Sequence, residues 1–148
     1  MVEGERDLAF GSLVRCSLSR ENPKTGSHEC TGQVMPKAFS EEISTVVSRC
    51  METFLGQLPS SVSLVLMLGT TDAYIKGCRA AMKRLGGSAF SEINDVAYRR
   101  GNATFVHVSH PSGLNGHHPM WMTADGNTTA GRKRLLACDA IAKAGPPT

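Results

Sequence analysis

Four of the five histidines in this chain lie in one short segment, residues 104–119, with the sequence TFVHVSHPSGLNGHHP. The segment begins with an apolar run that has the pattern of a buried strand, and that run leads directly into His110. His110, His117 and His118 could together coordinate a zinc ion, but their spacing fits none of the usual zinc-ligand patterns. We therefore expect no metal here. The loop is either a plain turn, which its Asn-Gly dipeptide favours, or a site built on His110.

Two apolar runs, VSLVLMLG (62–69) and ATFVHVS (103–109), are expected to position this loop. Both runs are apolar on both faces, which is typical of central parallel strands that helices cover on each side. In such sheets, ligands bind outside the carboxyl ends of the strands. The segments LGTTDA and HPSGLNG follow these two ends, so we expect them to line one cleft. His107 lies inside the second run and is predicted to be a satisfied strand residue.

The rest of the chain predicts an α/β protein. SEEISTVVSRCMETFLGQL (40–58) has apolar residues at helical spacing, with Ser40 as N-cap and Pro59 as the stop. Alternating strands and helices predict a three-layer α/β/α sandwich with a mainly parallel central sheet. We expect strands 62–69 and 103–109 to be adjacent and parallel in its interior. The other predicted segments are strands at 8–18 and 93–98, helices at 70–87 and 130–144, a turn at 99–102 and a long surface loop at 19–37.

Composition and charge limit the classes of protein that are possible. The chain has 148 residues, of which 41% are hydrophobic and 20% charged, as in ordinary globular domains. No apolar run approaches the ~20 residues that span a bilayer, and the N-terminus lacks the apolar core of a signal peptide. We therefore expect a cytoplasmic protein with free thiols and no membrane contact. The net charge of +3 permits contact with a polyanion. The basic residues cluster as Arg15 with Arg20, Lys83 with Arg84, Arg99 with Arg100, and Arg132 with Lys133 and Arg134.

The segment HPSGLNGHH, at the end of a predicted buried strand, resembles the His-Pro-Ser loop of the uracil-DNA glycosylase superfamily. The likeness extends upstream over GSLVRC and EEISTVVSRCMETFLGQLPSSVSLVLMLGTTDAYI, and it covers residues 8–144. In that superfamily a strand ends near a cysteine-containing loop, a helix carries a second cysteine, and a buried strand closes with Leu-Gly. The resemblance implies a single glycosylase-like domain over 1–148, which flips a damaged base out of DNA and cuts its N-glycosidic bond.

The resemblance also implies roles for individual residues. His110 would hydrogen-bond the base oxygen on which negative charge grows as the bond breaks. Leu114 matches a wedge that enters the base stack after flipping. Ser12 stands where relatives carry an asparagine that reads the edge of uracil. The implied DNA-binding set is Ser112, at a phosphate-contacting position, Gly113, in place of the usual proline, Leu114 and Asn115.

The chain departs from the superfamily in its first motif, a Gly-rich segment whose acidic or Asn residue positions the attacking water. No counterpart precedes the likeness, so we expect the domain to be N-terminally incomplete. Two alternatives to an active enzyme stay open: a catalytically silent relative that keeps DNA binding, and a small nucleotide-binding α/β domain that uses the helix N-terminus at 70–72. Cys16 and Cys50 fall near two of the four cysteines that hold an iron–sulfur cluster in one branch. The other two have no counterpart, so we expect no cluster and no other cofactor.

Overall fold

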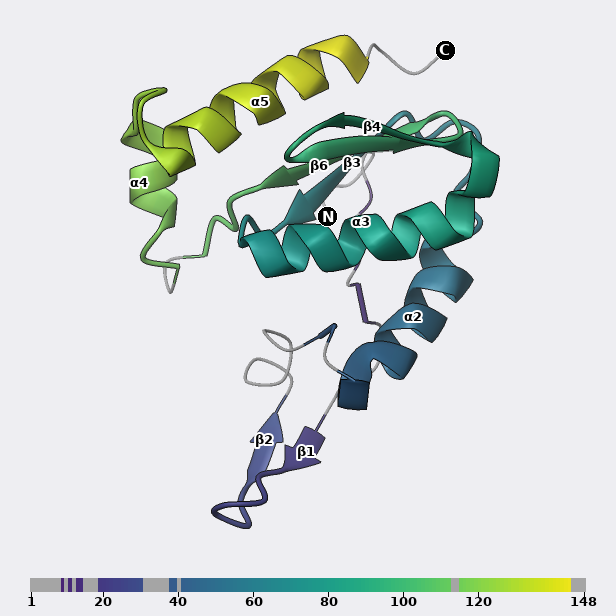
Figure 1. Ribbon diagram of the computed structural model, residues 1–148, viewed down its shortest axis with the longest axis vertical. Helices are drawn as coiled ribbons and strands as arrows, with labels where there is room; N and C mark the ends of the chain where they lie inside the picture. Colours follow the sequence, from purple (N-terminus) through teal and green to yellow (C-terminus); the bar gives the residue numbers. More distant parts are fainter. Residues whose placement is uncertain are drawn as a thin grey trace. The chain divides into compact units, whose positions relative to one another are not determined.

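The computed structural model describes residues 9, 11, 13–14, 19–30, 38–39, 41–112 and 115–144 (Figure 1). The chain divides into two compact units, Met1–Leu55 and Gly56–Thr148. The predicted strand at 8–18 falls mostly outside the described residues. Leu13 and Val14, which are described, form a bend rather than a strand.

The first unit contains a β-hairpin that the sequence analysis missed. Strands β1 (Ser19–Glu21) and β2 (His28–Cys30) pair antiparallel, with Arg20 directly opposite Glu29. The Arg20 guanidinium donates to the Glu29 carboxylate through Nε at 3.1 Å and through a terminal nitrogen at 2.6 Å. Opposite charges facing each other across a strand pair stabilise that register. The prediction of one long loop over 19–37 is therefore wrong for the strands at 19–21 and 28–30, which residues 22–27 connect, while 31–37 lie outside the described residues.

The predicted helix over 40–58 is confirmed as α2 (Glu41–Leu55). Ile43, Val47 and Met51 recur at helical spacing and are buried, as the periodicity predicts. The helix ends at Leu55, earlier than predicted, because Gly56 follows and glycine is a poor helix former.

The second unit is mixed α/β and contains one four-stranded sheet in the order β3-β6-β5-β4. Strands β3 and β6 pair parallel in register, with Leu66 opposite Val106, whereas β6 with β5 and β5 with β4 pair antiparallel. Helices α3 and α5 lie on opposite sides of the sheet (Figure 1). The elements of this unit are β3 (Leu64–Leu68), α3 (Asp72–Gly86), a 3-10 turn (Gly87–Ala89), β4 (Phe90–Asn94), β5 (Ala97–Arg100), β6 (Ala103–Val108), α4 (His118–Thr123) and α5 (Thr129–Ala144).

This sheet corrects three predictions. It is mixed rather than mainly parallel, because one of its three strand pairs is parallel. The predicted strand at 93–98 is two strands, since β4 and β5 meet at a turn whose second residue, Val96, is apolar and fully buried. The predicted turn at 99–102 is confined to Gly101 and Asn102. Gly101 has a φ of +57°, as glycine has at the first central position of a type II′ hairpin turn.

The predicted adjacency of the two apolar strands is confirmed, but the predicted interior position of β3 is wrong. Within the described sheet, β6 lies between β3 and β5, and β3 lies at the edge. Leu66 and Leu68 are 49% and 44% exposed, respectively, on the face of β3 that continues from Val106 and Val108. The apolar run predicted that both faces of the strand are buried, but Leu66 and Leu68 are exposed.

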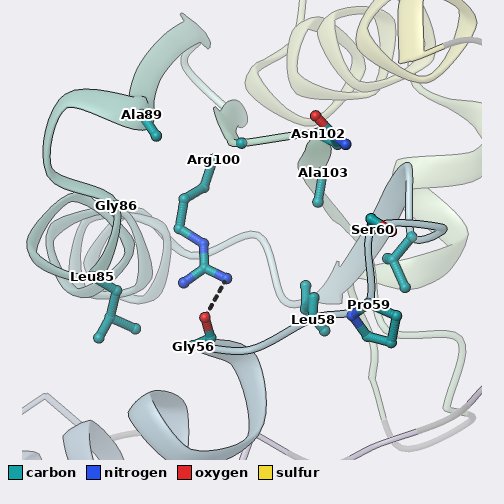
Figure 2. A pocket seen from close by; sticks show the side chains of 12 residues that line it. Gly56, Leu58, Pro59, Ser60, Leu85, Gly86, Ala89, Arg100, Asn102 and Ala103 are labelled. Carbon is teal, nitrogen blue, oxygen red and sulfur yellow. Dashed lines mark hydrogen bonds between the residues drawn. The ribbon is translucent and has the colours of Figure 1, made fainter.

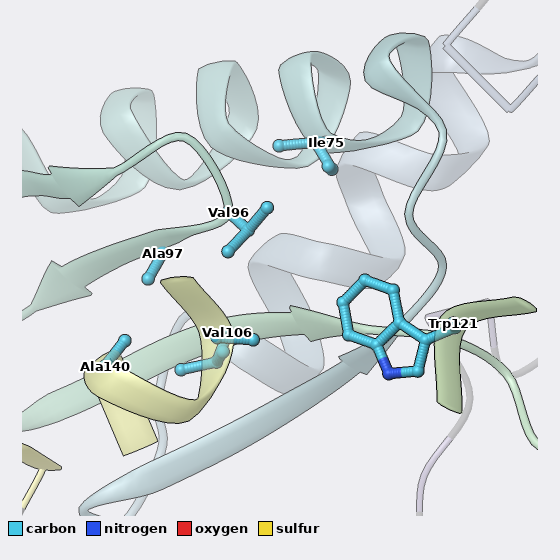
Figure 3. Close-up of a cluster of buried hydrophobic side chains, with 7 residues drawn as sticks. Ile75, Val96, Ala97, Val106, Trp121 and Ala140 are labelled. Carbon is cyan, nitrogen blue, oxygen red and sulfur yellow. The ribbon is translucent and has the colours of Figure 1, made fainter. Parts of the chain in front are cut away.

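One face of the sheet packs against α5 through small side chains. Val106 and Ala97, which are opposite each other on β6 and β5, form a buried cluster with Ala137 and Ala140 of α5 (Figure 3). Trp121 of α4 belongs to the same cluster. Alanines on both sides let the helix approach the sheet closely, so α5 holds a fixed position above the strand that leads into the His110 loop.

Candidate functional site

The carboxyl ends of β3 and β6 lie side by side, as predicted. The two strands run parallel, Leu68 pairs with Val108, and the Gly69 N–H donates to the Val108 carbonyl at 2.8 Å. The turn after β3, Gly69–Asp72, and the loop after β6 therefore leave the same edge of the sheet. This edge is where α/β sheets place their ligands.

His110 is exposed, and its ring orientation is fixed by the loop backbone. The Ser112 N–H donates to His110 Nδ1 at 3.0 Å. A backbone N–H can only donate, so Nδ1 is the acceptor and the neutral ring carries its hydrogen on Nε2. The loop therefore presents an outward hydrogen-bond donor at a position that β6 and the Ser112 amide define.

Asn115 braces the loop from inside. Its Nδ2 donates to the His110 carbonyl at 2.8 Å and to Ser109 Oγ at 3.2 Å. Its Oδ1 accepts the His117 N–H at 3.2 Å, and its own N–H donates to the Ser112 carbonyl at 2.9 Å. The Asn-Gly signal thus marks a turn, and the same side chain that forms this turn also holds His110. Ser112 is half-buried, and its N–H is the group that orients the ring.

Three of the predicted site residues lie outside the described residues: Ser12, Gly113 and Leu114. Cys16, one of the two candidate cluster ligands, lies outside them as well, and the other, Cys50, is a buried free thiol. Among the described residues, no group of three or more histidine, cysteine or acidic side chains is placed to hold a metal ion.

His107 is fully buried and satisfied on both ring nitrogens, so the prediction of a satisfied strand residue is confirmed. Its Nδ1 lies 3.1 Å from the Gly69 carbonyl oxygen and its Nε2 lies 3.3 Å from the Tyr98 hydroxyl. A carbonyl cannot donate, so Nδ1 carries the hydrogen and Nε2 accepts from Tyr98. Burial lowers the pKa of His107 to about 4, with the Gly69 hydrogen bond opposing this shift and the charges of Arg79 and Lys133 adding to it.

Lys133 of α5 reaches the turn after β3. Its Nζ donates to the Thr70 carbonyl at 2.7 Å and pairs with Asp72 Oδ1 at 2.6 Å. In the sequence, Lys133 stands out only as a member of a basic cluster. No local signal shows this contact, because the partners are 63 and 61 residues apart along the chain.

Several of the basic residues that suggested a polyanion-binding surface instead bind backbone carbonyls. Arg134 donates to the Met122 and Ala124 carbonyls and so fastens α5 to the end of α4. Arg79, which belongs to none of those sequence clusters, likewise donates to the carbonyls of residues 94 and 95 at 2.8 and 2.7 Å. Arg100 donates to the Gly56 carbonyl at 3.2 Å, and burial lowers its pKa. These guanidinium groups stabilise the fold, so charge clustering in sequence overstates the basic surface.

A cavity of about 390 Å³ lies at the other end of β6 (Figure 2). Its lining includes Ala103, the first residue of β6, together with Leu58, Leu85 and Arg100. His110 follows the last residue of the same strand. The cavity is therefore separate from the site at the carboxyl ends of β3 and β6.

The helices of the described ranges are all too short or too polar to span a bilayer. No family model matches the chain, and no curated protein or solved structure matches it either. The candidate site therefore consists of the turn after β3 and the loop after β6. The loop holds the oriented His110 ring and the backbone that Asn115 braces.

Proposed function

We propose that this protein is a uracil-DNA glycosylase-like hydrolase that cuts the N-glycosidic bond of a deaminated base in DNA. The observation that carries the proposal is the exposed His110 ring beyond the end of β6, whose Nδ1 accepts from the Ser112 amide and whose Nε2 therefore carries the hydrogen. Some reactions build negative charge on an oxygen in the transition state. A hydrogen-bond donor that is fixed before the substrate binds stabilises that charge. The glycosylase-like fold belongs to the same proposal.

The reaction needs few groups from the protein. Water adds to C1′ of the deoxyribose, the C1′–N bond breaks, and its electron pair leaves with the base. Negative charge then spreads onto the base oxygen, where His110 Nε2–H donates its hydrogen bond. The water proton passes to solvent, the departing base anion takes up a proton from solvent, and the products are a free base and an abasic site. The donor acts most strongly in the transition state, so it raises the rate more than the affinity.

The loop beyond His110 would contact the DNA. In the proposal, Leu114 enters the base stack as the target base leaves it. Ser112 and Gly113 face the phosphate backbone. The bracing of Asn115 supports this arrangement, because its hydrogen bonds hold the described residues on the two sides of 113–114 to one another.

A second candidate is a relative that binds DNA without cutting it. One observation favours it: Asp72, a carboxylate at this edge of the sheet, already binds Lys133 Nζ at 2.6 Å, a partner that an attacking water would have to share. This candidate keeps the same loop and the same partner, but it predicts binding with no product.

An excision assay decides between the two candidates. The protein is incubated in excess with a labelled oligonucleotide that contains one uracil, and the abasic product is cleaved with alkali. We expect a break at the uracil and none in a matched oligonucleotide with thymine there. Binding to both oligonucleotides without a break would support the silent relative. Neither binding nor cleavage would refute the proposed function.

A further inference from the structure

The turn after β3 is held through two consecutive carbonyl groups by side chains from two other elements. His107 of β6 donates to the Gly69 carbonyl at 3.1 Å, and Lys133 of α5 donates to the Thr70 carbonyl at 2.7 Å. Each bond joins segments far apart in sequence, so neither arises from local turn formation. These two side chains therefore act together with the Gly69 N–H bond to the Val108 carbonyl in setting the position of the turn.

The His107 ring is itself immobilised. The Tyr98 hydroxyl of β5 donates to Nε2, and the Tyr74 ring of α3 meets the imidazole edge-on with a centroid distance of 5.6 Å. Tyr74 also covers Gly69, because a Cβ added at Gly69 would lie 2.7 Å from Tyr74 Cδ1. Gly69 has a φ of +151°, which side chains other than glycine rarely adopt. Tyr74 and His107 thus both contact Gly69, and Tyr98 holds the His107 ring.

We propose that His107 is a positioning residue for the site at the carboxyl ends of β3 and β6. This inference rests on the proposed function. His107 lies on β6, and His110 lies three positions further along, in the loop that follows the strand. The turn that His107 binds leaves the same edge of the sheet as that loop. It acts through Gly69 and touches no substrate. Its effect is to keep the turn after β3 at a set distance from the donor on His110.

Burial disfavours a charge on the His107 ring. The groups that face or influence it are Tyr98 of β5, Tyr74 of α3, and the charges of Arg79 and Lys133. A proton on Nε2 would change that nitrogen from an acceptor to a donor and reverse its hydrogen bond with Tyr98. Two cations nearby oppose the added charge, so the neutral ring with Nδ1–H toward Gly69 is the state that holds the turn.

Two variants separate positioning from bulk packing. His107→Asn keeps an amide N–H where Nδ1–H lies, whereas His107→Leu keeps an apolar volume but has no donor. In the excision assay, we expect His107→Leu to lower the single-turnover rate constant by about 10- to 100-fold, because a small displacement of a reacting geometry has effects of that size. Its affinity for uracil-containing DNA should be unchanged. His107→Asn should remain close to the wild-type rate.

The second readout needs no activity. In amide spectra of the folded variants, the signals of Thr70 and Thr71 should move in His107→Leu and stay in place in His107→Asn. Equal movement in both variants, or movement in neither, would overturn the positioning role. If the wild-type protein cuts no DNA while the amide signals behave as expected, the proposed function fails and the role of His107 in holding the turn stands.

Discussion

The substitution His110→Ala is expected to lower the rate of uracil excision on the order of 100- to 1000-fold, the usual effect of removing one donor from a developing negative charge. The structure gives the reason. The Ser112 amide occupies Nδ1, so the ring offers Nε2–H outward, and no other atom of the side chain can replace it. The rate constant is measured under single turnover, with protein in excess over a uracil-containing oligonucleotide.

The matched control is His117→Ala. His117 is an exposed histidine of the same loop, and its recorded contact to Asn115 runs through its backbone N–H, which alanine keeps. The excision rate of His117→Ala should stay close to that of the wild type. The DNA affinity of both variants should stay within a few-fold of the wild-type affinity, because the His110 contact strengthens only as charge develops. A His110→Ala protein that excises uracil at the wild-type rate would remove His110 from the mechanism.

The free energy of unfolding should fall by about 3 kcal/mol as the pH drops from about 6.5 to about 4, from His107 alone. The unfolded chain binds a proton at this histidine below its ordinary pKa of about 6.5, whereas the native pKa of His107 is about 4. Between these values the unfolded state holds more protons than the native state, so stability rises with pH there. The contribution is complete above about 6.5 and is lost below about 4.

Other groups also titrate in this range, so the comparison is made with His107→Asn, which has no titrating ring. Urea unfolding of both proteins at several pH values gives the two stability curves. Between pH 4 and 6.5, the slopes of the two curves should differ by the change in unfolding free energy per pH unit that corresponds to one bound proton. Above that range the curves should run parallel. Curves that stay parallel throughout would show that His107 is protonated equally in the native and unfolded states.

The part of the fold that sequence predicted well is the part that depends on long apolar runs. Residues 62–69 and 103–109 were expected as adjacent parallel strands, and β3 and β6 are adjacent and parallel. The helical periodicity of 40–58 and 130–144 was likewise sufficient to find α2 and α5. Strands and helices of this kind can be predicted from sequence because burial selects the same residue types along the whole element.

The errors came from residues whose role depends on distant partners. Val96 is apolar because it is buried, yet it lies in a turn, so its pattern suggested one strand where there are two. Arg134 and Lys133 were counted as surface charges, although they bind carbonyls of α4 and of the turn after β3. At the site, sequence singled out His110 and the Asn-Gly turn. It gave no sign that Asn115 braces the His110 carbonyl, because that geometry exists only once the loop has formed.

The most direct test of the central claim is the nitrogen-15 spectrum of the histidine rings, with His110 assigned by comparison with His110→Ala. Under conditions where the rings are neutral, His110 should show the tautomer with hydrogen on Nε2. Its Nε2 signal should shift on binding an oligonucleotide with a 2′-fluorinated deoxyuridine, whose electron-poor sugar resists cleavage. The matched thymidine oligonucleotide should leave it unchanged. Hydrogen on Nδ1, or an Nε2 signal that responds to neither oligonucleotide, would contradict the account.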